Sequence, residues 1–148
     1  MPQSLARVLV HMVFSTKHRE PLIPPPLRER VFSYLGGILA GISCPPVIVG
    51  GTSDHVHALF VLSKNLALSK AAEELKKDSS KWAKLHVHPA FYWQSGYGAF
   101  SVDPEDVDAV RAYIATQEQH HAAHTFQDEV RDLYRKAVMD WDERYVWD

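Results

Sequence analysis

Residues 54–60 read Asp-His-Val-His-Ala-Leu-Phe, an alternation of polar and apolar side chains that is typical of a β-strand. Successive side chains on a strand point to opposite faces, so His55 and His57 share one face. The valine, alanine and phenylalanine between and after them share the other face. The apolar side chains are expected to enter a core beneath helices, which leaves the two imidazoles together on the opposite face of a sheet.

The segments on either side of this strand give further strand and helix signals. The β-branched and apolar run Ala6–Ser15 predicts a central, mostly buried strand. Pro24–Pro26 is suited to open a helix over Leu27–Ala40, and Gly41 to end it. The other expected elements are a strand at Val47–Val49, a turn at Gly50-Gly51 into the strand His55–Leu62, a helix over Leu66–His86, short strands at Phe91–Trp93 and Ala99–Val102, and helices over 104–121 and Gln127–Val138.

The order of these elements is β-α-β-β-α-β followed by two helices. This order predicts an α+β, ferredoxin-like antiparallel sheet with helices on one face and a C-terminal helical extension that carries Tyr113. A chain of 148 residues fits one domain, so a single domain over residues 1–148 is expected. The fold alone does not decide the function.

The single cysteine, Cys44, excludes an internal disulfide and fits a reducing cytoplasm. A lone cysteine beside Pro45-Pro46 is more often core filler than a nucleophile. The sequence holds no apolar run of the roughly 18 residues that a membrane span needs, and its start has no secretory signal pattern. A cytoplasmic protein without membrane attachment is therefore expected.

The charge distribution matters more than the total charge. The net charge of −2 is unlike that of a typical duplex-DNA binder. Residues 64–84, however, hold six lysines against three acidic residues, while most acids lie after Ser101. A local field can steer a polyanion, so one basic face remains possible, as does a simple solvated helix face.

Two further motifs carry candidate chemistry. Tyr113 and Gln117 stand four residues apart in an expected helix, so both should project from one helix face, with His120 and His121 continuing the ridge. An amphipathic helix with a packed tyrosine and a solvated glutamine would give the same pattern.

The stretch from Trp93 to Val102 interleaves aromatic residues with glycines. Aromatic faces can stack on unpaired bases, which is worth about 1–3 kcal/mol for each base. A tight bend with packed aromatic side chains would give the same pattern.

Taken together and in this order, the motifs resemble the HUH transposases with a single catalytic tyrosine, the insertion sequence 200-like class. The resemblance covers most of the chain. It rests on the first-strand segment His11-Met-Val-Phe-Ser-Thr-Lys17, the pair His55-Val-His57, Ser79-Ser-Lys-Trp82, Trp93-Gln-Ser-Gly-Tyr-Gly-Ala-Phe-Ser-Val102, and Tyr113-Ile-Ala-Thr-Gln117 with His120-His121.

The resemblance implies a transposase that cleaves and rejoins single-stranded DNA at hairpins near element ends. Tyr113 would be the nucleophile and would form a 5′-phosphotyrosine, leaving a free 3′-OH. His55, His57 and Gln117 would hold Mg²⁺ or Mn²⁺, with His11 and His121 in supporting positions. Candidate DNA contacts are Lys17, Arg19, Lys76, Lys77, Lys81, Trp93 and Tyr97.

The resemblance also implies a homodimer. The Gly96–Gly98 bend and the Val102–Pro104 junction could send the tyrosine helix to either protomer, so active sites that combine the histidines of one chain with the tyrosine of the other are expected. Two other functions fit parts of the pattern. One is a zinc hydrolase that uses His55 and His57 with His121 or His124; the other is a single-strand-binding module that cuts nothing.

Overall fold

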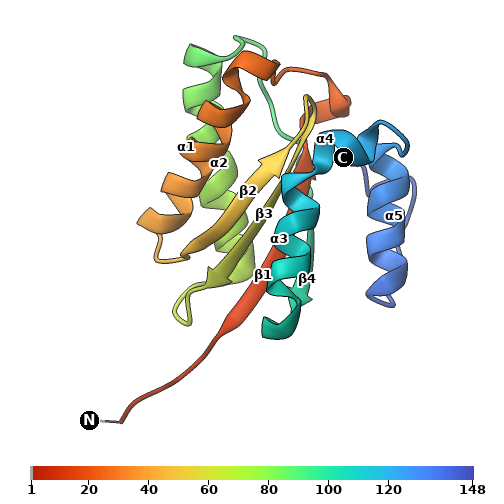
Figure 1. The fold of residues 1–148 in the computed structure, drawn as a ribbon. Helices are drawn as coiled ribbons and strands as arrows, with labels where there is room; N and C mark the ends of the chain where they lie inside the picture. Colours follow the sequence, from red (N-terminus) through yellow and green to blue (C-terminus); the bar gives the residue numbers. More distant parts are fainter. Residues whose placement is uncertain (1) are drawn as a thin grey trace.

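The computed structural model describes residues 2–148 and contains one four-stranded antiparallel sheet with the strand order β2-β3-β1-β4 (Figure 1). The strands are β1 (Val8–Ser15), β2 (Pro46–Gly51), β3 (His55–Leu62) and β4 (Gly98–Val102). The helices are α1 (Pro25–Gly41), α2 (Leu68–His86), α3 (Val107–Ala115), α4 (Gln117–His121) and α5 (Phe126–Lys136), with 3-10 turns η1 (Lys17–Arg19) and η2 (Pro104–Asp106). An α+β fold with an antiparallel sheet is thus confirmed.

Three expected elements differ from the observed ones. Gly50 and Gly51 extend β2 instead of forming the turn, which lies at 52–54. Phe91–Trp93 is a loop that meets the sheet through a bridge between Thr16 and Trp93. The helix expected over 104–121 is divided into η2, α3 and α4.

The division between α3 and α4 has a local cause at Thr116. This residue leaves helical geometry, with φ −109° and ψ 25°, and its hydroxyl donates to the carbonyl of Ala112 at 3.0 Å. A threonine hydroxyl that bonds back to the preceding turn competes with the helix ladder and bends the chain. Tyr113 and Gln117 therefore belong to two helical segments, not to one continuous ridge.

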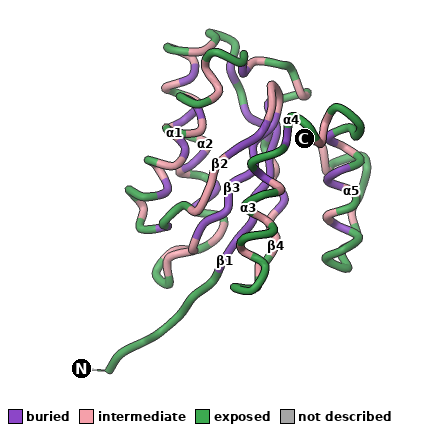
Figure 2. The backbone as a smooth tube through the Cα atoms, viewed as in Figure 1, coloured by how far each residue is buried: buried purple, intermediate pink, exposed green. Residues whose placement is uncertain are grey.

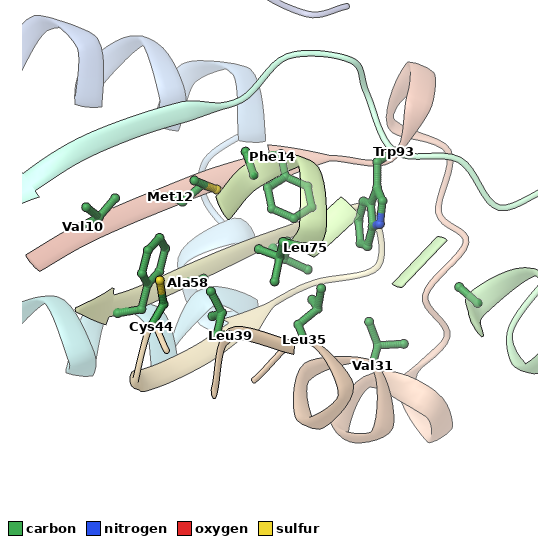
Figure 3. Packing of buried hydrophobic residues seen from close by; sticks show 14 of the residues in the cluster. Val10, Met12, Phe14, Val31, Leu35, Leu39, Cys44, Ala58, Leu75 and Trp93 are labelled. Carbon is green, nitrogen blue, oxygen red and sulfur yellow. The ribbon is translucent and has the colours of Figure 1, made fainter. Parts of the chain in front are cut away.

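One face of the sheet packs against α1 and α2 and forms the main apolar core. Phe14 and Met12 of β1 and Ala58 of β3 are almost fully buried there, facing Leu35 and Leu75 from the two helices (Figure 3). Cys44 lies in the same cluster with no exposed surface, in agreement with a packing role. The burial of these apolar side chains supplies most of the driving force for folding.

The other face of the sheet is covered by the C-terminal helices (Figure 1). The two central strands, β1 and β3, are accordingly buried along most of their length (Figure 2). Val13 of β1 packs against Phe126, Val130 and Tyr134 of α5. Helix α3 crosses β2 so closely that a Cβ on Gly50 would lie 2.9 Å from both the Cγ2 atom and the carbonyl oxygen of Ile114. Helices thus cover both faces, because the C-terminal extension folds back over the face opposite α1 and α2.

Within residues 2–148, no helix combines the length and the apolar character that crossing a membrane would require.

Candidate active site

The space between the sheet and the C-terminal helices holds a cluster of buried polar side chains. His55 and His57 from β3 are 1% and 0% exposed, and Glu129 from α5 is 3% exposed. The two histidines share a face, as the alternation predicted, but the helices cover that face completely. Buried polar groups need partners, and here the partners are one another.

Glu129 is the centre of this cluster. Its Oε1 atom accepts hydrogen bonds from His57 Nε2 at 3.0 Å and His121 Nε2 at 3.1 Å. Its Oε2 atom accepts from Gln117 Nε2 at 2.9 Å and from the Tyr113 hydroxyl. Burial alone would raise the pKa of this carboxyl, but the hydrogen bonds from His121, His57 and Tyr113 outweigh it and hold the pKa below its ordinary value.

His57 is fixed from both sides of its ring. Its Nε2 atom donates to Glu129, so its Nδ1 atom accepts from His11 Nε2 of β1 at 2.8 Å. The two rings are stacked with centroids 5.1 Å apart. Burial and the neighbouring His57 lower the pKa of His11 to about 3, and burial lowers that of His57. A neutral imidazole pair is therefore the stable state.

His55 is oriented by the turn that precedes it. Its Nδ1 atom lies 2.8 Å from Asp54 Oδ1 and 3.0 Å from the Thr52 hydroxyl, and its Nε2 atom lies 2.9 Å from Gln117 Oε1. A carboxylate behind an imidazole fixes the ring orientation and increases its basicity. Asp54 thus aims the second nitrogen of His55 at the cluster.

Tyr113 reaches the cluster from α3. Its ring centroid lies 5.8 Å from that of His57 and 6.3 Å from that of His11. Burial and the adjacent Glu129 carboxylate raise the pKa of the phenol above its ordinary value. The hydroxyl is therefore protonated at neutral pH and a weak nucleophile until positive charge is placed beside it.

The donor atoms converge in a way that suits a divalent cation. One ligand atom from each of His55, His121 and Glu129 lies within 4.8 Å of the other two. His57 Nε2 and Gln117 Oε1, from the ligand set expected from the sequence, hydrogen-bond to members of this group. Imidazole and oxygen donors without a thiolate suit Mn²⁺ or Zn²⁺, and the carboxylate also suits Mg²⁺. The residues therefore fit a metal ion.

All the groups in this cluster come from one chain. Tyr113 and Gln117 both bond to Glu129, which lies 16 and 12 residues further along the chain on α5. The crossed arrangement expected from the sequence, in which the tyrosine enters another protomer's site, involves a second chain and stays a prediction. The chain turns back at α4, and α5 then closes over the same histidines.

Glu129 was missed by the sequence reasoning, although the sequence holds a signal for it. On α5 the residues Phe126, Val130 and Tyr134 form the buried stripe, and Glu129 stands within that stripe. A carboxylate at an apolar position of an amphipathic helix requires a buried partner. Such a position can be read from the helical spacing alone.

Two of the expected DNA contacts, Trp93 and Lys76, have intramolecular partners. The Trp93 side chain is 7% exposed, packs edge-on against Phe14 and Phe91, and donates from Nε1 to the Ser79 hydroxyl at 2.8 Å. Lys76 donates to the carbonyls of residues 94–96, and burial lowers its pKa to about 8. The Trp93 side chain is therefore held in the core, whereas Lys76 is half-buried beside the loop at residues 94–96.

The other expected contacts lie nearer the surface. Lys17, Lys77 and Lys81 are exposed. Arg19 is half-buried, with its guanidinium 6.0 Å from the ring centroid of Trp147. Tyr97 is half-buried beneath the Lys76 ammonium, 5.5 Å from the ring centroid.

Comparison with known proteins gives a consistent result. The family model described as "Transposase IS200 like" matches residues 4–117. No curated protein sequence matches the chain. Among solved structures, a Deinococcus radiodurans R1 protein described as a transposase aligns with a TM-score of 0.61 at 17% identity, over 79% of this chain and 95% of the other. The REP-associated tyrosine transposase bound to a REP hairpin aligns with a TM-score of 0.61 at 14% identity, over 96% and 90% of the two chains.

Proposed function

The chain belongs to the IS200-like transposase family, and we propose that it cleaves and rejoins single-stranded DNA through a covalent phosphotyrosine on Tyr113. One observation carries the proposal. The hydroxyl of Tyr113 and the Nε2 atom of His57 contact the same carboxylate, that of Glu129, within one chain. A candidate nucleophile and candidate metal ligands thus meet at a single point.

In the proposed step, the Tyr113 oxygen attacks the phosphorus of a phosphodiester in line with the O3′ leaving group. The O–P bond to tyrosine forms, the P–O3′ bond breaks, and the phenolic proton passes to Glu129 Oε2, which already accepts the hydrogen bond from this hydroxyl. The proton then passes from Glu129, through solvent, to the leaving O3′, which becomes a free hydroxyl, so no net proton is gained or lost. The ester conserves the bond energy, so attack by another 3′-OH can rejoin strands without ATP.

His55, His57 and Gln117, with His121 and Glu129 beside them, would hold Mg²⁺ or Mn²⁺. A divalent cation there would supply Lewis-acid polarisation of the phosphate oxygens. The chain's own contribution is orientation. Asp54 fixes the ring of His55, and His11 fixes that of His57.

The substrate, assembly and setting are part of the same proposal. The fold neighbour bound to a REP hairpin supports a DNA hairpin as the substrate. We also retain the homodimer, the single domain over residues 1–148, the ferredoxin-like description of the sheet and a cytoplasmic setting.

The test is a covalent adduct. The protein is incubated with a labelled single-stranded hairpin library and Mn²⁺, and the products are separated under denaturing conditions. The wild type should give a DNA-bound protein band, and Tyr113→Phe should give none while binding the same strands within about twofold. Tyr145→Phe, which removes an exposed hydroxyl, is the control and should behave as the wild type. A denaturant-resistant band from Tyr113→Phe would refute the assignment of the nucleophile.

A zinc-dependent hydrolase is the second candidate, and the grouping of His55, His121 and Glu129 favours it, since two histidines and a glutamate are a donor set of catalytic zinc sites. His124 does not join this group through its ring; its backbone carbonyl accepts from His121 Nδ1 at 2.7 Å. A hydrolase of this kind would release unattached products and would retain its activity in Tyr113→Phe.

A further inference from the structure

A cavity of about 570 Å³ lies between α3 and α5, on the tyrosine side of the active site. Tyr113 and Glu129 belong to its lining, so the proposed nucleophile opens onto it. Its volume falls within the range of small-molecule sites, roughly 300–1,000 Å³, and a nucleobase fits in it.

The walls of this cavity combine apolar surface with polar groups, as a base requires. Ala109 and Val110 of α3 and Leu133 of α5 line it and provide apolar surface against which the face of a base can pack. Asp106 and Asp132 also line it and add negative charge beside that of Glu129. His120 and Lys136 belong to the lining as well, so the cavity offers hydrogen-bond donors beside its carboxylate acceptors. A base, which both donates and accepts hydrogen bonds, matches this mixed lining.

The carboxylates of the two aspartates differ in their hydrogen-bond partners. The Asp106 carboxylate has no hydrogen-bond or ion-pair partner among residues 2–148, whereas Asp132 shares one oxygen with Arg135 at 2.8 Å. Asp132 is nevertheless close enough to Tyr113 to contribute to the raised pKa of the phenol. The cavity therefore offers carboxylate acceptors close to the nucleophile.

We propose that this cavity holds the base of the nucleotide whose 5′-phosphate becomes joined to Tyr113, and that Asp106 and Asp132 select a base with an exocyclic amine. The inference rests on the proposed function, because the covalent bond to Tyr113 would hold that nucleotide beside the cavity that Tyr113 lines. Adenine, cytosine and guanine carry an amine that a carboxylate can accept from. Thymine carries carbonyl oxygens instead, and a carboxylate repels them. Lys136, also in the lining, is placed to contact the flanking phosphate.

Binding selection provides the first test and requires no cleavage. The Tyr113→Phe protein is used to select strands from a DNA hairpin library with randomised single-stranded flanks. One flank position should exclude thymine by about tenfold or more, in line with the worth of a good base contact. In Asp106→Asn/Asp132→Asn on the same background, this exclusion should fall to within about twofold, with the other positions unchanged. Asp108→Asn, which removes an exposed acid of α3 outside the cavity lining, should keep the exclusion.

Filling the cavity provides the second test. Ala109→Phe, on the wall, should weaken binding of the selected strands about tenfold, whereas Ala112→Phe, exposed on the same helix and outside the lining, should not. Both alanines are exposed on the same helix, so the two variants are matched in their effect on folding, and thermal melts of both variants check this. A thymine exclusion that the two aspartate changes leave intact, or equal binding by the two phenylalanine variants, would overturn the base site.

The same strands separate this inference from the proposed function. The wild-type protein is allowed to cleave the selected strands, and the nucleotide joined to Tyr113 is identified by proteolysis and mass spectrometry. This nucleotide should come from the flank position at which thymine is excluded. If thymine is excluded at a different position, the base site is overturned. Absence of any covalent adduct would refute the strand-transfer function. The aspartate-dependent preference would still decide whether the cavity binds a base.

Discussion

The two faces of the sheet are both buried, yet the side chains of β1 and β3 meet different surroundings on each. Towards α1 and α2 the strands present Met12, Phe14 and Ala58, whose only requirement is shape. Towards the C-terminal helices they present His11, His55 and His57, each of which needs a defined hydrogen-bond partner. The first face stabilises the fold, whereas the second depends on that stability to keep several polar groups dehydrated and aligned.

The largest expected effect comes from opening the apolar face. Phe14→Ala removes a fully buried ring that contacts Trp93 and should lower the free energy of unfolding by about 3–5 kcal/mol. Denaturant titration measures this loss. At a temperature where the variant is folded, the rate of covalent adduct formation per folded molecule should stay near that of the wild type. A large loss of rate in the folded variant would show that the two faces are coupled.

The converse change is made on the polar face. His57→Ala should reduce covalent adduct formation on the order of 100-fold or more, and should weaken Mn²⁺ binding measured by calorimetry, because it removes both a candidate ligand and a partner of Glu129. Val56→Ala, the adjacent residue that points into the apolar core, is the matched control and should affect stability but not Mn²⁺ affinity. Equal Mn²⁺ affinity in His57→Ala and the wild type would remove His57 from the ligand set.

Acid should separate the faces further, since only one of them titrates. The pKa of folded His11 lies near 3, below the roughly 6.5 of an unfolded histidine, so below pH 6.5 the unfolded chain binds more protons than the folded one. Stability from this group is thus fully present above pH 6.5 and is lost as the pH falls towards 3. Urea titrations in EDTA should show this decline, and His11→Gln, which cannot titrate, should reduce its slope between pH 6.5 and 5. An unchanged slope would argue against a neutral buried His11.

The smallest expected effect concerns how α5 is held over the polar face. The Thr125 hydroxyl caps α5 by accepting from the backbone N–H of Asp128 at 3.1 Å. Thr125→Ala should cost about 1 kcal/mol of unfolding free energy. If α5 positions Glu129 only through its packing, the adduct rate of the folded variant should be unchanged. A loss of rate greater than the loss of stability would show that the cap itself aligns the carboxylate.

The sequence predicted what local patterns encode. Alternation in His55–Phe60 placed the histidines on one face and the apolar side chains on the other, and the prolines at Pro24–Pro26 marked the start of α1. What it could not give was what covers a face. The histidines were expected together on the face opposite the apolar core, and nothing local indicates that α5 folds back over them.

The same limit applies at single residues, whose long-range partners the sequence does not reveal. Trp93 and Lys76 have types that suit nucleic-acid binding, but their roles are set by long-range partners, Ser79 and the carbonyls of residues 94–96. Glu129 could have been found from its place in the apolar stripe of α5. Its contacts with Tyr113 and His57 could not, because they join three separate elements.

The close crossing of α3 over Gly50 has a consequence for how sequence variation in this chain is interpreted. Position 50 has room for hydrogen alone, because any larger substituent must displace Ile114, the residue next to Tyr113. A methyl group there would push α3 outwards by tenths of an ångström while β2 keeps its ladder with β3. A variant survey scored by soluble expression would rate alanine at position 50 as tolerated, whereas one scored by strand transfer would rate it as inactivating. Positions that the two surveys score differently would be those at which a small displacement of the backbone stops the reaction but does not prevent folding.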